Sequence, residues 1–230
     1  MKKITLIIIM ILVIFCLGGC KGKNTDALKF KNEYEDLNGK TSKSEKTYLD
    51  VSIDNDNPIV YLTAKEASEK INSDTGVFYF GFPECPWCRN ALPVLLNAAK
   101  NSELDKIYYV NMYDVRDTME VDTEGNVVTT KKGATGYSEL LDSLDSILDD
   151  YTLTDSNDNQ ILTGEKRVYV PLVVFVVDGK IVSYHTDTVS SQTDPYVALD
   201  ESQKEELYQI YNDGIHKVLG DVCDEDEERC

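Results

Sequence analysis

Apolar and polar residues follow one another in blocks between residues 58 and 219, and each block has the period of one type of secondary structure. Val77–Phe80 is continuously apolar, which is typical of a strand buried on both faces. Residues 89–100 instead carry apolar side chains at helical spacing on one side. Pro93 lies within that helix, so we expect a kink there.

The same periods predict the order of the elements along the chain. Strands are expected at 58–62, 77–80, 107–112, 168–177 and 180–185, and helices at 63–71, 89–100, 138–150 and 201–219. Thr63–Glu66 has the spacing of a capping box, and Asp178-Gly179 is a hairpin turn signal. Strands that alternate with helices, followed by a hairpin and a closing helix, predict an α/β fold with a mixed central sheet flanked by helices.

The stretch from 114 to 166 has a weaker pattern. Residues 122–126 have the composition of a turn between two weak strands. The apolar face of the helix expected at 138–150 is more typical of core packing than of a groove for a partner. A polar loop is expected at 154–159.

The N-terminus has the pattern of a bacterial secretion signal. Lys2 and Lys3 precede an uncharged apolar run, 4–17, that is too short to span a bilayer comfortably. The run ends in Leu17-Gly18-Gly19-Cys20, which resembles a lipobox, in which the cysteine becomes the lipidated first residue. The alternative is a membrane anchor that happens to contain a cysteine. A lipobox implies a signal peptide at 1–19 and a lipid such as palmitate on Cys20.

Composition divides the rest of the chain. Residues 20–47 carry few apolar side chains and are expected to be a flexible tether, before a folded domain at 48–220 and an acidic tail at 221–230. The formal charge is −18, and loss of Lys2 and Lys3 would make it more negative by two. Such an acidic chain repels nucleic acid and anionic lipid, so attachment to the bilayer would come from the lipid alone.

The motif Cys85-Pro86-Trp87-Cys88 lies where the strand at 77–80 gives way to the helix at 89–100. The free N–H groups and the dipole of a helix N-terminus stabilise a thiolate, which is the nucleophile of disulfide exchange. Metal binding, as in a copper or zinc chaperone, is the minor alternative, because a zinc site would need a second ligand pair. The other late cysteines, Cys223 and Cys230, do not have zinc spacing.

Three features together resemble the thioredoxin superfamily, over roughly residues 59–219. They are the C-x-x-C at the junction of strand and helix, Pro93 eight residues after Cys85, and Val170-Pro171 before the Asp178-Gly179 hairpin. The resemblance implies a thioredoxin-like fold, with 114–166 as an insertion before the strand that follows a cis-proline at Pro171. The alternative for Pro171 is an ordinary trans proline on an edge strand.

The resemblance also implies a role for each residue of the site. Cys85 would be the nucleophile and Cys88 would resolve the mixed disulfide. Pro171 in cis would face the sulfurs and leave the backbone groups of Val170 free to hold a substrate strand. No cofactor beyond the dithiol is implied.

Pro86 and Trp87 complete the motif. Pro86 would start the helix, and Trp87 would contact a substrate or only cover the helix start. This Pro-aromatic pair is closer to glutaredoxins and to thioredoxins of the bacteriocin transport accessory type than to thioredoxins with Gly-Pro.

Two positions depart from the family pattern. Many thioredoxins bury an aspartate six residues before the first cysteine, as a proton acceptor for the resolving thiol, and this chain has Tyr79 there. The second departure is the 114–166 segment, which is expected to shape a substrate groove or to dock a partner.

The pair Cys223 and Cys230 is expected to close a small structural disulfide, with a second redox pair as the alternative. The leading hypothesis is a lipid-anchored thiol–disulfide oxidoreductase on the extracytoplasmic face of a bacterial membrane. Its partners would be secreted or envelope proteins with cysteines or disulfides, and a membrane redox partner that recycles the site. The alternative is a non-catalytic accessory or binding lipoprotein for secretion or export.

Overall fold

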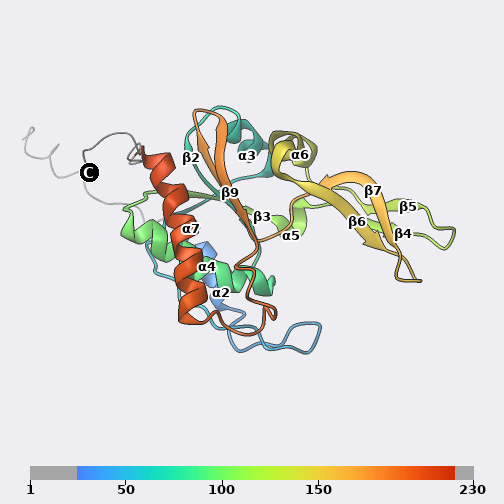
Figure 1. Ribbon diagram of the computed structural model, residues 1–230, viewed down its shortest axis with the longest axis horizontal. Helices are drawn as coiled ribbons and strands as arrows, with labels where there is room; N and C mark the ends of the chain where they lie inside the picture. Colours follow the sequence, from blue (N-terminus) through green and yellow to red (C-terminus); the bar gives the residue numbers. More distant parts are fainter. Residues whose placement is uncertain (1–24, 221–230) are drawn as a thin grey trace, which may run out of the picture.

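In the computed structural model, which describes residues 25–220, a five-stranded mixed sheet forms the centre of the protein (Figure 1). Its strands, in order across the sheet, are β1 (Ile59–Tyr61), β3 (Ile107–Asn111), β2 (Gly76–Gly81), β8 (Leu172–Val177) and β9 (Lys180–Thr186). The strands β1, β3 and β2 are parallel, and β8 and β9 are antiparallel to their neighbours. The predicted mixed sheet flanked by helices is therefore confirmed.

The central strand β2 is buried along its whole length. It pairs with β3 on one side and with β8 on the other, so its backbone groups are satisfied by two neighbours. Successive side chains point to opposite faces: Val77 and Tyr79 pack in one core, and Phe78 and Phe80 in the other. The continuous apolar run in the sequence follows from this double burial.

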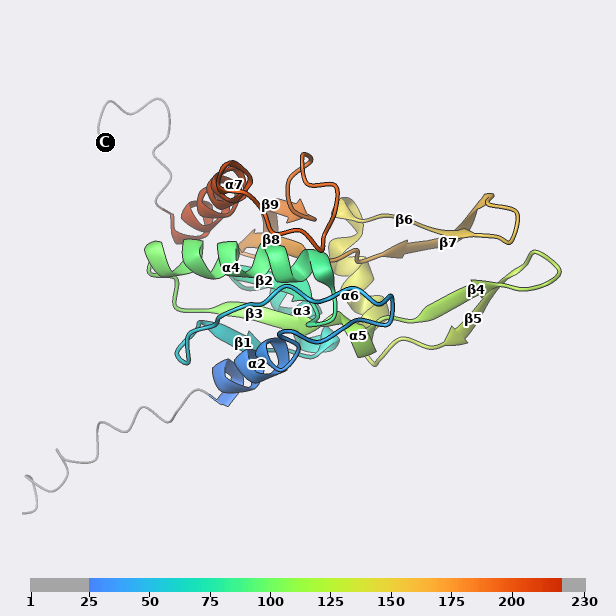
Figure 2. The ribbon, with the colours of Figure 1, turned by 90° about the horizontal axis from the view of Figure 1, so that it is seen from below.

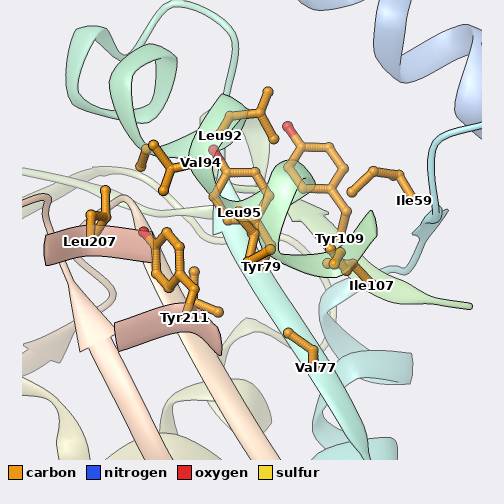
Figure 3. Close-up of a cluster of buried hydrophobic side chains, with 14 of the residues drawn as sticks. Ile59, Val77, Tyr79, Leu92, Val94, Leu95, Ile107, Tyr109, Leu207 and Tyr211 are labelled. Carbon is orange, nitrogen blue, oxygen red and sulfur yellow. The ribbon is translucent and has the colours of Figure 1, made fainter. Parts of the chain in front are cut away.

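Helices cover both faces of the sheet (Figure 2). The helices α4 (Pro86–Asn101) and α7 (Glu201–Leu219) contribute to the core on one face, whereas α3 (Ala64–Ile71) and α6 (Tyr137–Leu144) contribute to the other. Figure 3 shows how Leu92 and Leu95 of α4 meet Tyr79 and Tyr109 of the sheet in the first of these cores.

Capping residues fix the starts of two helices. Thr63 and Glu66 form the predicted capping box of α3. Asp200 and Gln203 form a second capping box at the start of α7. Each box satisfies backbone N–H groups that the first helical turn leaves without partners.

Two β-ribbons lie outside the central sheet, and both project from the same end of the molecule (Figures 1 and 2). One pairs β4 (Thr118–Val121) with β5 (Val127–Lys131), after the short helix α5 (Met112–Val115). The other pairs β6 (Asp149–Thr154) with β7 (Gln160–Arg167). The weak strands expected around 122–126 are present, whereas the second ribbon was not expected.

The helix predicted at 138–150 is too long. The helix α6 ends at Leu144, a 3₁₀ turn follows at Asp145–Ile147, and β6 begins at Asp149. The apolar spacing continues past Leu144 because Ile147 and Leu148 still pack against the same core, although the chain there is no longer α-helical.

The prediction of a flexible tether over 20–47 is wrong for the residues that the structure describes. Thr25–Glu35 forms the helix α2, in which Ala27, Phe30 and Tyr34 are buried. These three side chains lie on one face of the helix and join the core beside β1. The overall polarity of the segment hid this face, since apart from Leu28 its other positions carry polar or charged side chains.

Some sequence predictions fall outside the described residues. They are the signal peptide at 1–19, lipidation at Cys20, and the Cys223–Cys230 pair in the tail at 221–230. Among the helices of residues 25–220, none has the length and apolar character needed to cross a membrane.

Candidate functional site

Cys85 is the N-cap residue of α4, at the position that the sequence predicted. Its Sγ accepts a hydrogen bond from the backbone N–H of Cys88 at 3.1 Å. Pro86 occupies the first turn, where its missing N–H costs no hydrogen bond. A sulfur that receives a helix N-terminal N–H is in a position to carry negative charge.

The two sulfurs differ in their access to solvent. Cys85 is 5% exposed and Cys88 is fully buried, and both are free thiols. Burial raises the pKa of the Cys88 thiol well above its ordinary value, and negative charge on Cys85 raises it further. The N–H of Phe82 and the hydroxyl of Tyr79 lower the pKa of Cys88 by smaller amounts. In the reduced pair, Cys88 therefore keeps its proton, and Cys85, the less deeply buried cysteine, is the one available to react.

Val170 and Pro171 lie directly against the first cysteine. The Sγ of Cys85 lies 3.7 Å from the carbonyl oxygen of Val170, 85 residues along the chain. The Val170–Pro171 peptide bond is cis, which is the geometry that the thioredoxin resemblance implies. Val170 is partly exposed, so its backbone borders the accessible side of the sulfur.

Tyr79 stands where the family pattern places a buried acid, and its side chain lies beside Cys88. Its hydroxyl is 3.0 Å from that of Tyr34 on α2. Its ring stacks on Tyr109, with centroids 5.4 Å apart, and the Tyr109 hydroxyl donates to the carbonyl of Gly81. Burial raises the pKa of Tyr79 well above its ordinary value, so this hydroxyl stays protonated and can only donate to a Cys88 thiolate.

Tyr211 of α7 lies on the opposite side of Tyr79 from Tyr109 (Figure 3). It is fully buried, and its hydroxyl has no hydrogen-bond partner among the described residues. Burial raises the pKa of Tyr211, and a charge on Cys88 would raise it further. The surroundings of Cys88 are thus built from neutral phenols rather than from a carboxylate.

Arg89 follows the motif directly and is almost completely buried. Its guanidinium donates to the carbonyls of Leu49, Tyr34 and Pro83 and to the side-chain oxygen of Asn38. Burial lowers the pKa of Arg89. The four acceptors bind the N–H groups of the guanidinium and so compensate for the loss of water around it. Arg89 therefore fixes the end of α2 and the loop before Cys85 to the start of α4.

Trp87 is partly buried and borders a hollow of about 460 Å³ beside the site. The end of β9, with His185, and the loop after it, with Thr188 and Gln192, form the other wall. This places Trp87 where a polypeptide bound near Cys85 could contact its ring. The two roles expected for Trp87 remain alternatives.

The structure thus brings together Cys85, Cys88, Val170 and Pro171, with Trp87 at the side. The sequence analysis missed Arg89 and Arg116, and it missed Tyr34 because its helix was expected to be a tether. An arginine directly after a C-x-x-C, within a helix otherwise apolar on its inner side, is the one local signal that could have indicated burial. Within residues 25–220, no group of three or more His, Cys, Asp or Glu side chains is arranged to hold a metal.

No protein-family model matches the chain, and no curated protein matches it in sequence. Its function is therefore inferred from the geometry of the site.

Proposed function

We propose that the protein is a thiol–disulfide oxidoreductase with a thioredoxin-like fold and that Cys85 and Cys88 are its redox pair. The observation that carries the proposal is the placement of Cys85 at the N-cap of α4, with its Sγ beside the Val170 carbonyl. The sheet order and the position of the proline before β8 support it.

The reaction would proceed by two thiolate–disulfide exchanges. In the reducing direction, the Cys85 thiolate attacks one sulfur of a substrate disulfide. The other substrate sulfur leaves as a thiolate and takes a proton from water. Cys88 then gives its proton to water and attacks Cys85 as a thiolate, which forms the Cys85–Cys88 disulfide and releases the second substrate sulfur as a thiolate. Two electrons pass to the substrate, and the oxidising direction is the reverse.

The proposal includes an extracytoplasmic, lipid-anchored location, which rests on the N-terminal sequence pattern. The substrates would then be secreted or envelope proteins with cysteines or disulfides, since disulfides persist outside the cytoplasm. A membrane redox partner with a cysteine pair of its own would recycle the site, so no bound cofactor is required.

The test is a redox titration of the full-length chain in detergent against glutathione, with Cys85→Ser and Cys88→Ser as matched variants. We expect reversible formation of one Cys85–Cys88 disulfide, and exchange with a peptide disulfide that Cys85→Ser abolishes. Cys88→Ser should instead trap a mixed disulfide on Cys85. Full exchange activity in Cys85→Ser would overturn the proposal.

A non-catalytic accessory role for secretion or export is the second candidate. The observation that favours it is the pair of ribbons, which projects from the sheet and carries exposed Leu162. The reduction potential separates the two: a value below about −300 mV indicates a structural bridge, and a higher value a functional one.

A further inference from the structure

Arg116, at the root of the first ribbon, lies between the two chain segments that border the Cys85 sulfur. Its guanidinium lies 5.1 Å from the ring centre of Phe82, and its Nη1 donates to the carbonyl of Val168 at 3.5 Å. The carbonyl of Phe82 in turn accepts from the N–H of Cys85 at 3.2 Å. Val168 is two residues before Val170, whose carbonyl meets the sulfur.

Arg167, the neighbouring cation, has a carboxylate partner, whereas Arg116 has none in the described part of the chain. Arg167, at the end of β7, forms an ion pair with Asp117 at 2.7 Å and lies over the ring of Tyr151 at 4.1 Å. Both partners of this ion pair are largely buried, so Asp117 is committed to Arg167. Arg116 has no ion pair within residues 25–220, and the long bond to Val168 leaves most of its five donors open.

Arg116 lies near the charge of Arg167, and among residues 25–220 it forms no ion pair of its own. Burial lowers the pKa of Arg116, and the charge of Arg167 lowers it further. Tyr137 of α6 and the two cysteines of α4 act in the opposite sense, since any negative charge on them would raise the pKa of Arg116. Of these three groups, Cys85 is the one whose sulfur accepts a helix N-terminal N–H, so this sulfur is the one placed to carry negative charge.

We propose that Arg116 is the counter-ion of the Cys85 thiolate and that it thereby stabilises the reduced state of the pair. The inference rests on the proposed function, since it assumes that Cys85 is the attacking sulfur. It also bears on direction: a cation that stabilises the thiolate makes the disulfide a stronger oxidant. Arg116 would not contact the substrate; its charge would stabilise the Cys85 thiolate, so it is a positioning residue.

The test compares Arg116→Gln with Arg116→Lys and with Lys180→Gln, each in the full-length chain in detergent. Lys180 begins β9 and is exposed, so Lys180→Gln removes the same charge away from the site. The rate of iodoacetamide alkylation at Cys85 is followed against pH by peptide mass spectrometry, in a Cys88→Ser background. The reduction potential is measured against glutathione with Cys88 intact.

We expect Arg116→Gln to move the midpoint of the alkylation profile upward by about one pH unit, which slows alkylation about tenfold at low pH. A tenfold change in the exchange constant with glutathione corresponds to a potential lower by about 30 mV. Arg116→Lys and Lys180→Gln should stay close to the wild type. Circular dichroism checks that the variants are folded, and Arg116→Met is the second charge-removing variant, with the same expected shift, if Arg116→Gln is not folded.

An unchanged alkylation profile in folded Arg116→Gln overturns the inference, and so does an equal shift in Lys180→Gln. A profile that stays unchanged while exchange with an acidic peptide slows would assign Arg116 to substrate recognition and would also overturn it. Alkylation does not require turnover, so a shifted profile in a protein that fails to exchange disulfides would separate this inference from the proposed function.

Discussion

At the scale of single residues, Cys88, the proposed resolving cysteine, has a tyrosine as its neighbour where the thioredoxin pattern has an acid. A buried carboxylate could accept the proton of Cys88, but Tyr79 cannot, because burial raises the pKa of its hydroxyl. Tyr79 can still donate to the thiolate once it forms. Its contribution would then be stabilisation of the Cys88 thiolate, with water as the proton acceptor.

Tyr79→Phe should therefore slow resolution of the mixed disulfide, by about tenfold for one lost charge-assisted hydrogen bond. Rapid acid quench of the reaction with a peptide disulfide measures this step. Tyr109→Phe is the matched control, because its hydroxyl donates to the Gly81 carbonyl. Both variants should lose about 1 kcal/mol of stability, but only Tyr79→Phe should accumulate the mixed disulfide. Equal accumulation in both would contradict this role for Tyr79.

The buried guanidinium of Arg89 connects three parts of the chain through four acceptors. Arg89→Met would leave buried carbonyls without donors, so we expect a loss of about 3 kcal/mol in the free energy of unfolding by urea. Lys100→Met is the comparison, because Lys100 forms an exposed ion pair with Asp54 and should change stability by less than about 1 kcal/mol. Similar midpoints for the two variants would show that the Arg89 network contributes little.

At the scale of elements, α2 is the part whose role the structure changed most. Phe30 packs against Tyr34, Tyr61 and Tyr109, so the helix completes the core beside the edge strand β1. The hydroxyl contact between Tyr34 and Tyr79 also connects this helix to the surroundings of Cys88. A helix near the start of the domain thus contributes to the surroundings of the cysteine pair.

Phe30→Ala should cost about 3 to 5 kcal/mol, because it leaves a cavity in a closely packed core. Leu162→Ala, at a side chain 65% exposed on the second ribbon, should stay within about 0.5 kcal/mol of the wild type. Thermal unfolding monitored by circular dichroism measures both. If Phe30→Ala unfolds at the wild-type temperature, then α2 is dispensable for the fold.

Unlike α2, the two ribbons are held near the core only at their roots. Arg167 and Asp117 join their roots by a largely buried ion pair, while their outer parts project away from the sheet. Their turns are closed locally, since Asp122 and Asp155 each accept backbone N–H groups from the residues that follow. The two roots are therefore held to each other, and the outer parts extend away from the sheet.

At the scale of the whole molecule, the charge of −18 should govern encounters with charged substrates. A peptide disulfide flanked by glutamates should react faster as salt rises from about 0.01 M to about 0.3 M, because screening shortens the Debye length from about 30 Å to below 10 Å. The same peptide flanked by lysines should react more slowly over this range. Stopped-flow rates measure both. A salt response of the same sign for the two peptides would show that the overall charge does not steer association.

Sequence patterns were informative where the physical cause is local. The run Val77–Phe80 and the capping box at Thr63 were predicted correctly, since each depends on neighbouring residues. The strand-to-helix position of Cys85 could be read in the same way. The second ribbon was missed because β6 and β7 have mostly exposed side chains, and the apolar alternation in β6 is limited to Tyr151 and Leu153.

The sequence by itself determined the order of the central strands and helices along the chain. It also determined the placement of a dithiol at a helix N-terminus, because periodicity and capping act over a few residues. Only the tertiary structure decided which distant side chains surround the sulfurs. Val170 meets Cys85 across 85 residues, and Tyr34 meets Tyr79 across 45. Arg116 contacts Phe82 and Val168, which belong to the chain segments on either side of the site. Such contacts depend on how the sheet orders its strands, and no local pattern records that order.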